Sequence, residues 1–310
     1  MKIIFFGSDD LALAHLKALV ASEHEVVVCV THPDKGKGRG LKVAASVIKE
    51  FAQKHEIPVL QPVDLKDVSF LSQLRATNCD LFVVVAYGRI MPPDLLMVPY
   101  ICSLNVHASL LPKYRGAAPI HWAIIKGETE TGITIFKMNS KMDAGDILDQ
   151  VKIGIDPGDN ASTLKSKMAQ VGPPFLLKTI ASLEKNAYIL RLQDKDQVSF
   201  APKLTKEMGK VEWRKKAIEI HNLVCGLVPW PSAYTLYNGK ILKILETSVV
   251  ELKGNPLQPG EVAEITDQGF VIATGKGGLL VKKIHLEASR PMDAKSFLAG
   301  HPILKGTLFS

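Results

Sequence analysis

The sequence has few cysteines and no long apolar run. Its four cysteines, Cys29, Cys79, Cys102 and Cys225, form no CxxC pair, and most of them lie in or beside apolar segments. In such places cysteine behaves as a small hydrophobic residue, so the sequence indicates neither a disulfide framework nor a zinc site. No apolar run approaches the roughly 20 residues that a membrane-spanning helix needs, so we expect no membrane partner.

The N-terminal segment lacks two further patterns. Residues 1–6 are followed at once by Gly7 and two acids, which is typical of a first strand and not of a signal peptide, so we expect a cytoplasmic location. The turn at 7–10, Gly-Ser-Asp-Asp, lacks the glycines that a bound pyrophosphate requires, which argues against a dinucleotide site. Asp9 or Asp10 is expected instead to cap the following helix.

The N-terminal half has the pattern of an α/β domain. The chain of 310 residues exceeds one typical domain, and with 46% hydrophobic residues it can bury a large core. Short apolar runs at 2–6, 26–30 and 81–85 alternate with helical patterns at 11–20 and 43–54. This alternation predicts a doubly wound, mostly parallel, Rossmann-like sheet.

The composition changes after about residue 190. A polar stretch at 192–197 indicates a linker, and a helical segment at 214–224 follows it. Next come the hairpin signal Asn238-Gly239 and short β-rich runs that predict a small C-terminal β-barrel. These runs lie at 241–250, 261–265, 270–274 and 279–284. We therefore expect a first domain at 1–189, a linker at 190–205 and a β domain at 206–310.

Two polar side chains follow a strand-like run at 100–104. Because residues i and i+2 of a strand point to the same side, Asn105 and His107 share a face. An amide that can donate to an oxygen, beside an imidazole that titrates near neutrality, suits chemistry on a carbonyl. Pro112 and Gly116 then break the chain, so the strand opens into a loop, where ligands commonly bind in α/β folds.

A second segment supplies a carboxylate. A strand-like run at 133–138 leads into a turn at 141–146 that contains Asp143 and Gly145. Near His107, Asp143 could orient the ring, stabilise the imidazolium and hold a water. An Asn-x-His at a strand end is by itself more often a turn stabiliser, and the sequence alone does not establish the proximity. The three side chains are therefore candidate catalytic residues.

These motifs resemble those of the enzymes that transfer formyl groups from 10-formyltetrahydrofolate, which carry Asn-x-His, Ser-Leu-Leu-Pro and a later Asp in such a turn. Within that superfamily the sequence is most similar to the methionyl-tRNA formyltransferases. The resemblance covers nearly the whole chain, through segments at 5–7, 32–40, 105–116, 200–204 and 229–231. One departure is the first turn, where Gly7 precedes Ser-Asp-Asp-Leu in place of the family's Gly-Thr-Pro-x-Phe.

The resemblance implies an enzyme that transfers the formyl group of 10-formyltetrahydrofolate to the α-amino group of methionyl-initiator tRNA. Its products would be N-formylmethionyl-tRNA, used in translation initiation, and tetrahydrofolate. Asn105, His107 and Asp143 would be catalytic, no metal would be required, and we expect a monomer. The resemblance also implies an oligonucleotide/oligosaccharide-binding (OB) barrel as the C-terminal domain, in contact with tRNA.

The resemblance further implies a folate site at two strand ends. One loop follows the run at 83–85, which is itself expected to be a core strand, and in relatives this loop helps hold the pterin. Apolar walls and exposed backbone groups there suit a flat heterocycle. The expected folate contacts are Ser109, Leu110, Leu111 and Pro112 from one loop, and Tyr87, Gly88 and Ile90 from the other.

The charge pattern favours an RNA partner only weakly. The formal charge is +7, and residues 206–310 hold 14 Lys and Arg against 10 Asp and Glu. A sharper feature is the segment 35–40, where Lys35, Lys37 and Arg39 alternate with glycines. Such a flexible basic finger could follow an RNA backbone. With the family resemblance, we expect these three residues to contact tRNA, Arg39 first among them.

Two alternatives stay open. A formyl-folate enzyme that acts on a small amine, such as glycinamide ribonucleotide or a sugar nucleotide, would share Asn105, His107 and Asp143. It would have no need of an appended β domain or of the basic finger. A catalytically silent RNA-binding protein would keep the fold, but the intact catalytic set argues against it.

Overall fold

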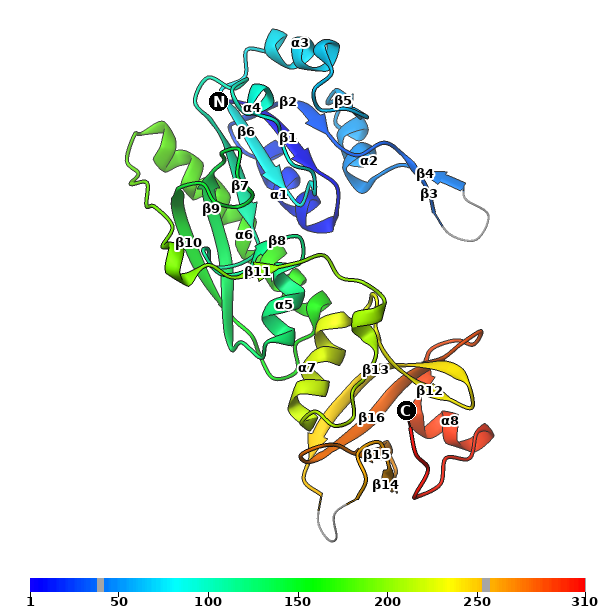
Figure 1. The fold of residues 1–310 in the computed structure, drawn as a ribbon. Helices are drawn as coiled ribbons and strands as arrows, with labels where there is room; N and C mark the ends of the chain where they lie inside the picture. The colour runs from blue at the N-terminus through cyan, green and yellow to red at the C-terminus, as the bar shows by residue number, and fades with distance from the viewer. Residues whose placement is uncertain (38–41, 253–256, 310) are drawn as a thin grey trace. The chain divides into compact units, whose positions relative to one another are not determined.

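The computed structural model describes residues 1–37, 42–252 and 257–309. They form two compact units, each described here by itself (Figure 1). Unit 1 comprises residues 1–119, 130–154 and 165–201, and unit 2 comprises residues 120–129, 155–164 and 202–310. In the described part of the chain, no helix has the length and apolar character needed to cross a membrane.

Unit 1 is built on a seven-stranded sheet in the order β10-β9-β7-β6-β1-β2-β5. Strands β1, β2, β5, β6 and β7 pair in parallel, whereas β9 and β10 run antiparallel at one edge. The bounds are Lys2–Gly7 (β1), Glu25–Val30 (β2), Val59–Leu60 (β5), Leu81–Val85 (β6), Cys102–His107 (β7), Glu130–Lys137 (β9) and Ile147–Gly154 (β10). The predicted mostly parallel α/β sheet is confirmed.

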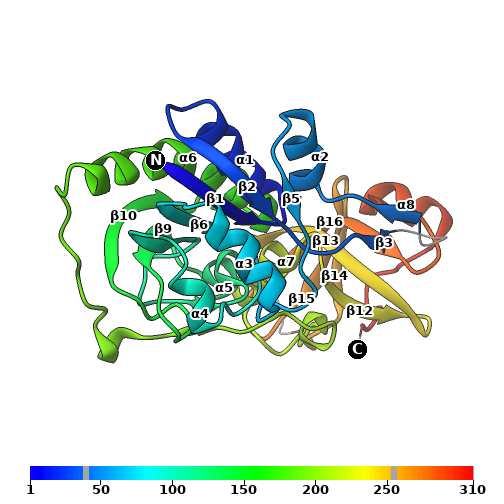
Figure 2. The same ribbon diagram turned by 90° about the horizontal axis from the view of Figure 1, so that it is seen from above.

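Helices cover both faces of this sheet, with α1 and α6 on one side and α3 and α4 on the other (Figure 2). The α3–α4 face buries alternate strand residues such as Ile4, Phe6 and Phe82 against Phe70 and Leu95. This alternation is the two-residue period of a strand, and it makes the sheet doubly wound. The helices are Asp10–Val20 (α1), Val47–Lys54 (α2), Val68–Ala76 (α3), Pro93–Leu96 (α4) and Ala161–Glu184 (α6).

Helix starts follow local chemistry. The Asp9 carboxylate accepts a hydrogen bond from Ala12 N at 3.0 Å, so the predicted cap of α1 is confirmed. The helix expected at 43–54 begins instead at Val47, where Ser46 caps it. Its first residues are taken up by an antiparallel hairpin between β3 (Lys35–Lys37) and β4 (Lys42–Ala44).

The segment after α6 belongs to unit 1, as most of α6 does. Ile147 and Arg191 exchange two backbone hydrogen bonds of 2.8 and 2.9 Å. A short helix η1 (Lys195–Gln197) follows, and then β11 (Phe200–Ala201) pairs in parallel with β8 (Arg115–Gly116). Arg191 and Phe200–Ala201 are therefore hydrogen-bonded to residues of unit 1, and the linker expected at 190–205 stays a prediction.

Unit 2 contains an antiparallel sheet in the order β12-β13-β16-β15-β14, with β17 paired to β16. Asn238 and Gly239, at φ of 49° and 75°, join β12 to β13 as the hairpin signal predicted. The strands are Ala233–Tyr237 (β12), Lys240–Val250 (β13), Val262–Thr266 (β14), Gly269–Ala273 (β15), Gly278–Leu286 (β16) and Met292–Asp293 (β17). The β character that the sequence predicts for the C-terminal domain is confirmed, as an antiparallel sheet.

Helices and aromatic residues complete unit 2. Its core packs Trp213, Phe270, Phe297 and Phe309 with aliphatic residues of the sheet. The helix expected at 214–224 is confirmed with shifted ends. The helices are Pro119–Ile125 (α5), Glu207–Gly209 (η2), Ala217–Leu227 (α7) and Ala294–Gly300 (α8).

Candidate active site

Asn105 and His107 lie at the end of β7, between β6 and β9. Asn105 is opposite Phe136 of β9, and His107 is opposite Thr134. His107 is buried, whereas Asn105 is half-buried. Among the described residues the Asn105 amide has no hydrogen-bond partner. Its N–H groups are thus available to a ligand oxygen at the strand end.

Hydrogen bonding orients the His107 ring. His107 Nε2 lies 3.0 Å from the carbonyl oxygen of Tyr114. A carbonyl oxygen can only accept, so Nε2 carries the proton and Nδ1 of the neutral ring is left as the acceptor. Nδ1 lies 3.8 Å from Asp143 Oδ2. This separation is too long for a direct hydrogen bond, but it is within the range of an ion pair when the ring is protonated.

Asp143 is held in the turn between β9 and β10. Its Oδ2 accepts a hydrogen bond from Gly116 N at 2.8 Å, and its backbone has a φ of 48°, in the left-handed region. A Cβ on Gly145 would lie 1.8 Å from the Lys137 carbonyl oxygen, so only glycine fits there. The structure thus brings together Asn105 and His107 on one strand and places the Asp143 carboxylate beside the histidine.

Sequence reasoning missed two side chains that support this turn from outside it. Gln193 Nε2 donates to the carbonyl oxygens of Asp143 (2.9 Å) and Gly145 (2.7 Å). Gln193 Oε1 accepts from Arg115 Nε (3.0 Å) and Nη2 (2.7 Å). The polar run around Gln193 is typical of a linker, so no local pattern marked this residue.

The loop of the expected folate contacts Ser109, Leu110, Leu111 and Pro112 is fixed by Thr134. The buried Thr134 hydroxyl donates to Ser109 O at 2.6 Å and accepts from Leu111 N at 3.0 Å. Gln150 Nε2 reaches the Leu111 carbonyl at 2.9 Å. The Leu111 side chain is itself buried against Phe136.

The other expected folate residues follow β6, whose end pairs with β7. Tyr87 is 2% exposed, its ring packs edge-on against Phe6, and its hydroxyl has no partner among the described residues. Gly88 has a φ of 70° and open space where a Cβ would stand, and Ile90 is exposed. The Tyr87 carbonyl is hydrogen-bonded to the His32 ring.

The expected tRNA contacts lie in and beside the β3–β4 hairpin. Lys35 and Lys37 are on β3, whereas Arg39 lies outside the described residues. At the base of the hairpin, Asp34 pairs with Lys49 and accepts a hydrogen bond from Gln61. These two partners lower the pKa of the Asp34 carboxyl, which keeps it charged.

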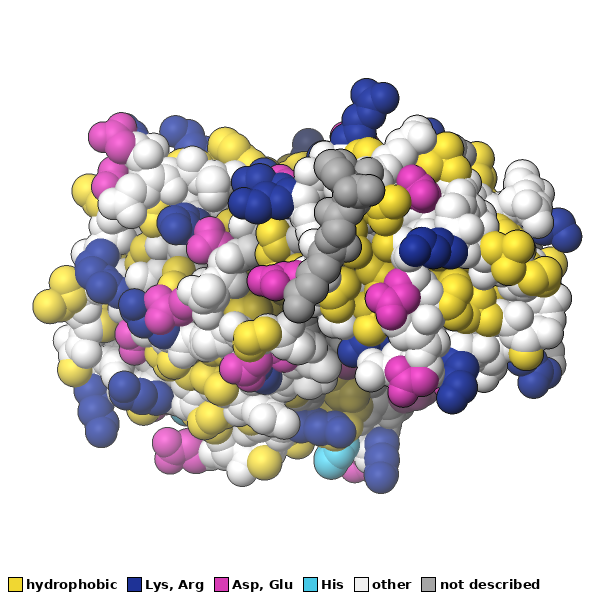
Figure 3. All heavy atoms as spheres, turned by 90° about the horizontal axis from the view of Figure 1, so that it is seen from below, with side chains coloured by type: hydrophobic (Ala, Val, Ile, Leu, Met, Phe, Trp, Pro, Cys, Tyr) yellow, Lys and Arg dark blue, Asp and Glu magenta, His cyan; other side chains and the backbone are white. Residues whose placement is uncertain are grey.

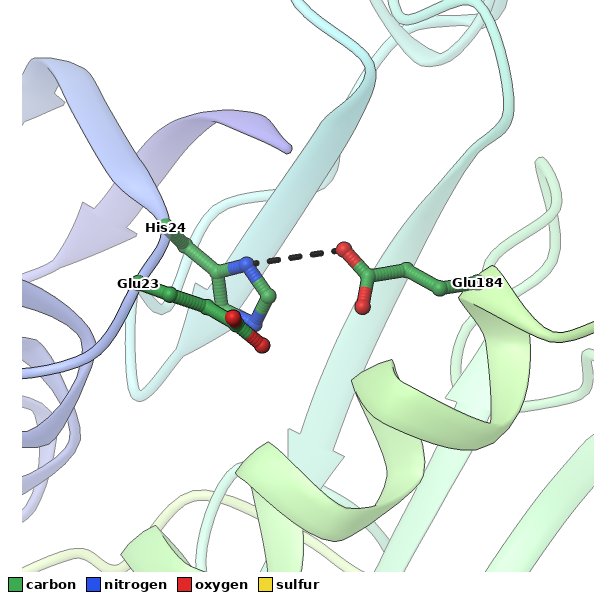
Figure 4. A group of neighbouring side chains, drawn as sticks. All are labelled: Glu23, His24 and Glu184. Carbon is green, nitrogen blue, oxygen red and sulfur yellow. Dashed lines mark ion pairs between the residues drawn. The ribbon is translucent and has the colours of Figure 1, made fainter.

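A cluster of potential metal ligands lies elsewhere. Glu23, His24 and Glu184 place one ligand atom each within 4.8 Å of the others (Figure 4). The Met1 ammonium is 3.6 Å from Glu184 Oε1, and His24 Nδ1 is also 3.6 Å from that oxygen. Glu184 thus contacts both the N-terminal amine and His24, and none of the three clustered residues belongs to the candidate active site.

Comparison with known proteins gives the family. Residues 1–180 match the formyl transferase model, and residues 203–302 match the model of the formyl transferase C-terminal domain. A methionyl-tRNA formyltransferase from Caldanaerobacter subterraneus subsp. tengcongensis is 43% identical over 309 residues, covering 99% of both chains. The chain belongs to the methionyl-tRNA formyltransferase family. Another member, from Acetivibrio thermocellus, is 41% identical over 99% of this chain and 98% of its own length.

A solved structure supports the fold of this family. The N-formyltransferase from Helicobacter canadensis, in complex with folinic acid and dTDP-3-aminofucose, covers 92% of this chain and 100% of its own. Its TM-score is 0.68 at 20% identity, so the likeness concerns the fold alone.

Proposed function

We propose that this chain transfers the formyl group of 10-formyltetrahydrofolate to the α-amino group of methionyl-initiator tRNA, giving N-formylmethionyl-tRNA for translation initiation. One observation carries the proposal. Asn105 and His107 share the end of β7, and Asp143 Oδ2 lies 3.8 Å from His107 Nδ1. Family membership supplies the substrates, because full-length relatives at 43% and 41% identity are methionyl-tRNA formyltransferases.

The first step is attack of the neutral amine nitrogen on the formyl carbon. A carbon–nitrogen bond forms, and the formyl oxygen becomes a tetrahedral oxyanion. The Asn105 amide, which has no partner among the described residues, donates to this oxygen, and the contact strengthens as charge develops.

The second step moves a proton from the attacking amine to the leaving nitrogen. The free Nδ1 of His107 accepts the amine proton, and the Asp143 carboxylate stabilises the imidazolium that results. Collapse of the intermediate breaks the bond between the formyl carbon and N10 of the folate. The proton passes to N10, so tetrahydrofolate leaves neutral at that nitrogen.

Further parts of the proposal come from the sequence and the family. The catalytic domain spans 1–189, the linker 190–205 and the tRNA-binding domain 206–310. The enzyme acts in the cytoplasm as a monomer. Folate lies against Ser109, Leu110, Leu111, Pro112, Tyr87, Gly88 and Ile90, and tRNA contacts Lys35, Lys37 and Arg39.

Net charge by itself gives little support to the RNA contacts. On the face shown in Figure 3, basic and acidic side chains are interspersed and do not gather in one basic track. The proposal therefore assigns tRNA recognition to the 35–40 finger and the C-terminal domain on grounds of family, with the overall charge of +7 as a general attraction for phosphate.

The test is transfer of radiolabelled formyl from 10-formyltetrahydrofolate to three acceptors offered in parallel. The acceptors are methionyl-initiator tRNA, uncharged initiator tRNA and glycinamide ribonucleotide. Label on the charged tRNA alone is expected. Label on the ribonucleotide would overturn the substrate, and RNA binding without any transfer would indicate a silent binder.

A further inference from the structure

We propose that Gln193 is a positioning residue that holds the Asp143 carboxylate beside His107, and that Arg115 holds Gln193. The inference rests on the proposed function, because it concerns the proton transfer assigned to His107 and Asp143. Gln193 does not touch the reacting atoms in this scheme. It acts through Asp143.

The Gln193 amide uses all of its hydrogen-bonding capacity in this one place. Its Nε2 donates to two carbonyl oxygens that lie on either side of Ala144, those of Asp143 at 2.9 Å and Gly145 at 2.7 Å. Its Oε1 accepts two N–H groups of Arg115 at 3.0 and 2.7 Å. An amide offers two donors and two acceptor sites, so it is fully satisfied and its orientation is fixed.

These contacts form a closed ring. Arg115 is followed by Gly116, whose N–H donates to Asp143 Oδ2 at 2.8 Å. The carbonyl oxygen of Asp143 is thus bonded to Gln193, Gln193 is bonded to Arg115, and the next residue, Gly116, is bonded to the carboxylate of Asp143. Both the backbone and the side chain of Asp143 are fixed. This fixes the position of its other carboxylate oxygen and the separation between Asp143 Oδ2 and His107 Nδ1.

Asp143 needs such support. Its φ of 48° is unfavourable for a residue with a Cβ, and such a conformation persists where the surroundings over-determine it. Burial lowers the pKa of Arg115, an effect that the nearby Asp143 charge opposes, so the guanidinium and the carboxylate also attract each other across the ring.

The burial pattern singles out Gln193. Within 184–197, all of which the structure describes, every other residue is exposed and Gln193 alone is half-buried. Two backbone hydrogen bonds between Arg191 and Ile147 bring this part of the chain to the start of β10. Gln193 is thus a polar residue turned inward from an exposed segment, with two hydrogen bonds to the turn at 143–145 and two to Arg115, as a positioning residue requires.

The first experiment compares Gln193→Leu with wild type in the formyl-transfer assay on full-length protein. We expect kcat to fall by roughly 100-fold, with KM for 10-formyltetrahydrofolate and the melting temperature nearly unchanged, because a displacement of about 1 Å in a catalytic group has this effect. Gln197→Leu is the matched control. Gln197 is exposed in the same segment, and among the described residues its amide bonds only to Asp194, so kcat of this variant should equal that of wild type.

A double-mutant cycle separates positioning from general stabilisation. In an Asp143→Ala background, Gln193→Leu should cause no further loss of kcat, since Gln193 acts through Asp143. A full additional loss would overturn the proposal, as would wild-type kcat in the single variant. If Gln193→Leu folds poorly, Gln193→Glu replaces it, because it keeps an oxygen for Arg115 and removes both donors to the turn.

The same assay distinguishes this inference from the proposed function. Wild-type transfer to a different acceptor would overturn the tRNA substrate and leave the Gln193 comparison intact. Wild-type protein that transfers no formyl group to any acceptor would overturn both.

Discussion

At the scale of single residues, the candidate active site depends on which polar atoms have no hydrogen-bond partner within the protein. His107 Nε2 is hydrogen-bonded to Tyr114 O, and Asp143 Oδ2 accepts from Gly116 N, so Nδ1 is the ring nitrogen that can accept a proton. Asn105 has no hydrogen-bond partner among the described residues, so in the proposed mechanism its amide is available to the substrate. In that mechanism the three side chains divide between stabilising the oxyanion and moving the proton.

Substitution of these residues should affect turnover more than binding. We expect Asn105→Ala to raise the barrier by about 3 kcal/mol, or on the order of 100-fold in kcat, with little change in the dissociation constant for folate. His107→Ala and Asp143→Ala should also lower kcat strongly. Steady-state kinetics measures kcat, and fluorescence titration measures the dissociation constant for folate. Wild-type turnover in any one variant would show that the substituted residue has no part in the mechanism.

At the scale of elements, strand β9 holds the proposed folate loop by one hydroxyl. Thr134 Oγ1 contacts Ser109 O, Leu111 N and Gln150 Nε2, and all of these lie on or next to the site. A buried backbone N–H that loses its acceptor is costly, so the loop and the strand are fixed together.

Thr134→Val should therefore destabilise unit 1 and weaken folate binding together. The substitution keeps the shape but leaves Leu111 N without its acceptor, at a cost of about 1–3 kcal/mol in the free energy of unfolding. Urea denaturation and the folate KM are the measurements. Ile133→Val on the same strand is the control, because it removes one methylene and no hydrogen bond. An unchanged KM for folate in Thr134→Val would show that this loop does not contribute to folate binding.

The packing of α1 on α6 makes stability depend on pH. Burial lowers the pKa of His15 below 6.5, and its Nε2 has no partner among the described residues. Gly172 of α6 packs against this ring so closely that a Cβ would lie 2.4 Å from Nε2. The neutral ring is therefore the folded form.

The sign of the pH effect follows from this shift. Because the folded pKa is lower, the unfolded state binds more protons, and the stabilisation is fully present above pH 6.5 and declines as pH falls below it. We expect the loss of unfolding free energy below pH 6.5 to be less steep in His15→Gln than in wild type. Denaturation at several pH values measures the slope, and equal slopes would show that folding does not change the pKa of His15.

At the scale of the whole molecule, two units serve two substrates in the proposed reaction. Unit 1 holds the strand ends where the formyl group would be transferred, and unit 2 contains the antiparallel sheet that matches the family's C-terminal domain. A tRNA offers phosphates along its length, which a second unit can contact.

The tRNA interaction should therefore depend on salt, and the folate interaction should not. The triple variant Lys35→Ala, Lys37→Ala, Arg39→Ala is expected to weaken tRNA binding and to reduce the slope of log affinity against log salt by about one for each phosphate that is no longer neutralised. Filter binding at several salt concentrations measures it. Lys185→Ala, an exposed lysine after α6, is the control. A slope equal to wild type would exclude the finger as a phosphate-binding element.

Features with a local cause could be predicted from the amino-acid sequence. The two-residue period of a strand puts Asn105 and His107 on one face, the Asp9 carboxylate starts α1, and Asn238-Gly239 adopts the positive φ values of a hairpin. Alternating strand and helix patterns likewise predicted the mostly parallel sheet. Each of these depends on neighbours a few residues away, which the printed sequence shows directly.

The tertiary structure alone decided contacts between distant residues. It set the 3.8 Å gap between His107 and Asp143, and it joined Gln193 to Arg115, 78 residues earlier in the chain. It also shortened α2, because 42–44 pair with 35–37 as a hairpin. Such contacts follow from the packing of strands and returning segments, and no periodicity in the sequence encodes which partners will meet.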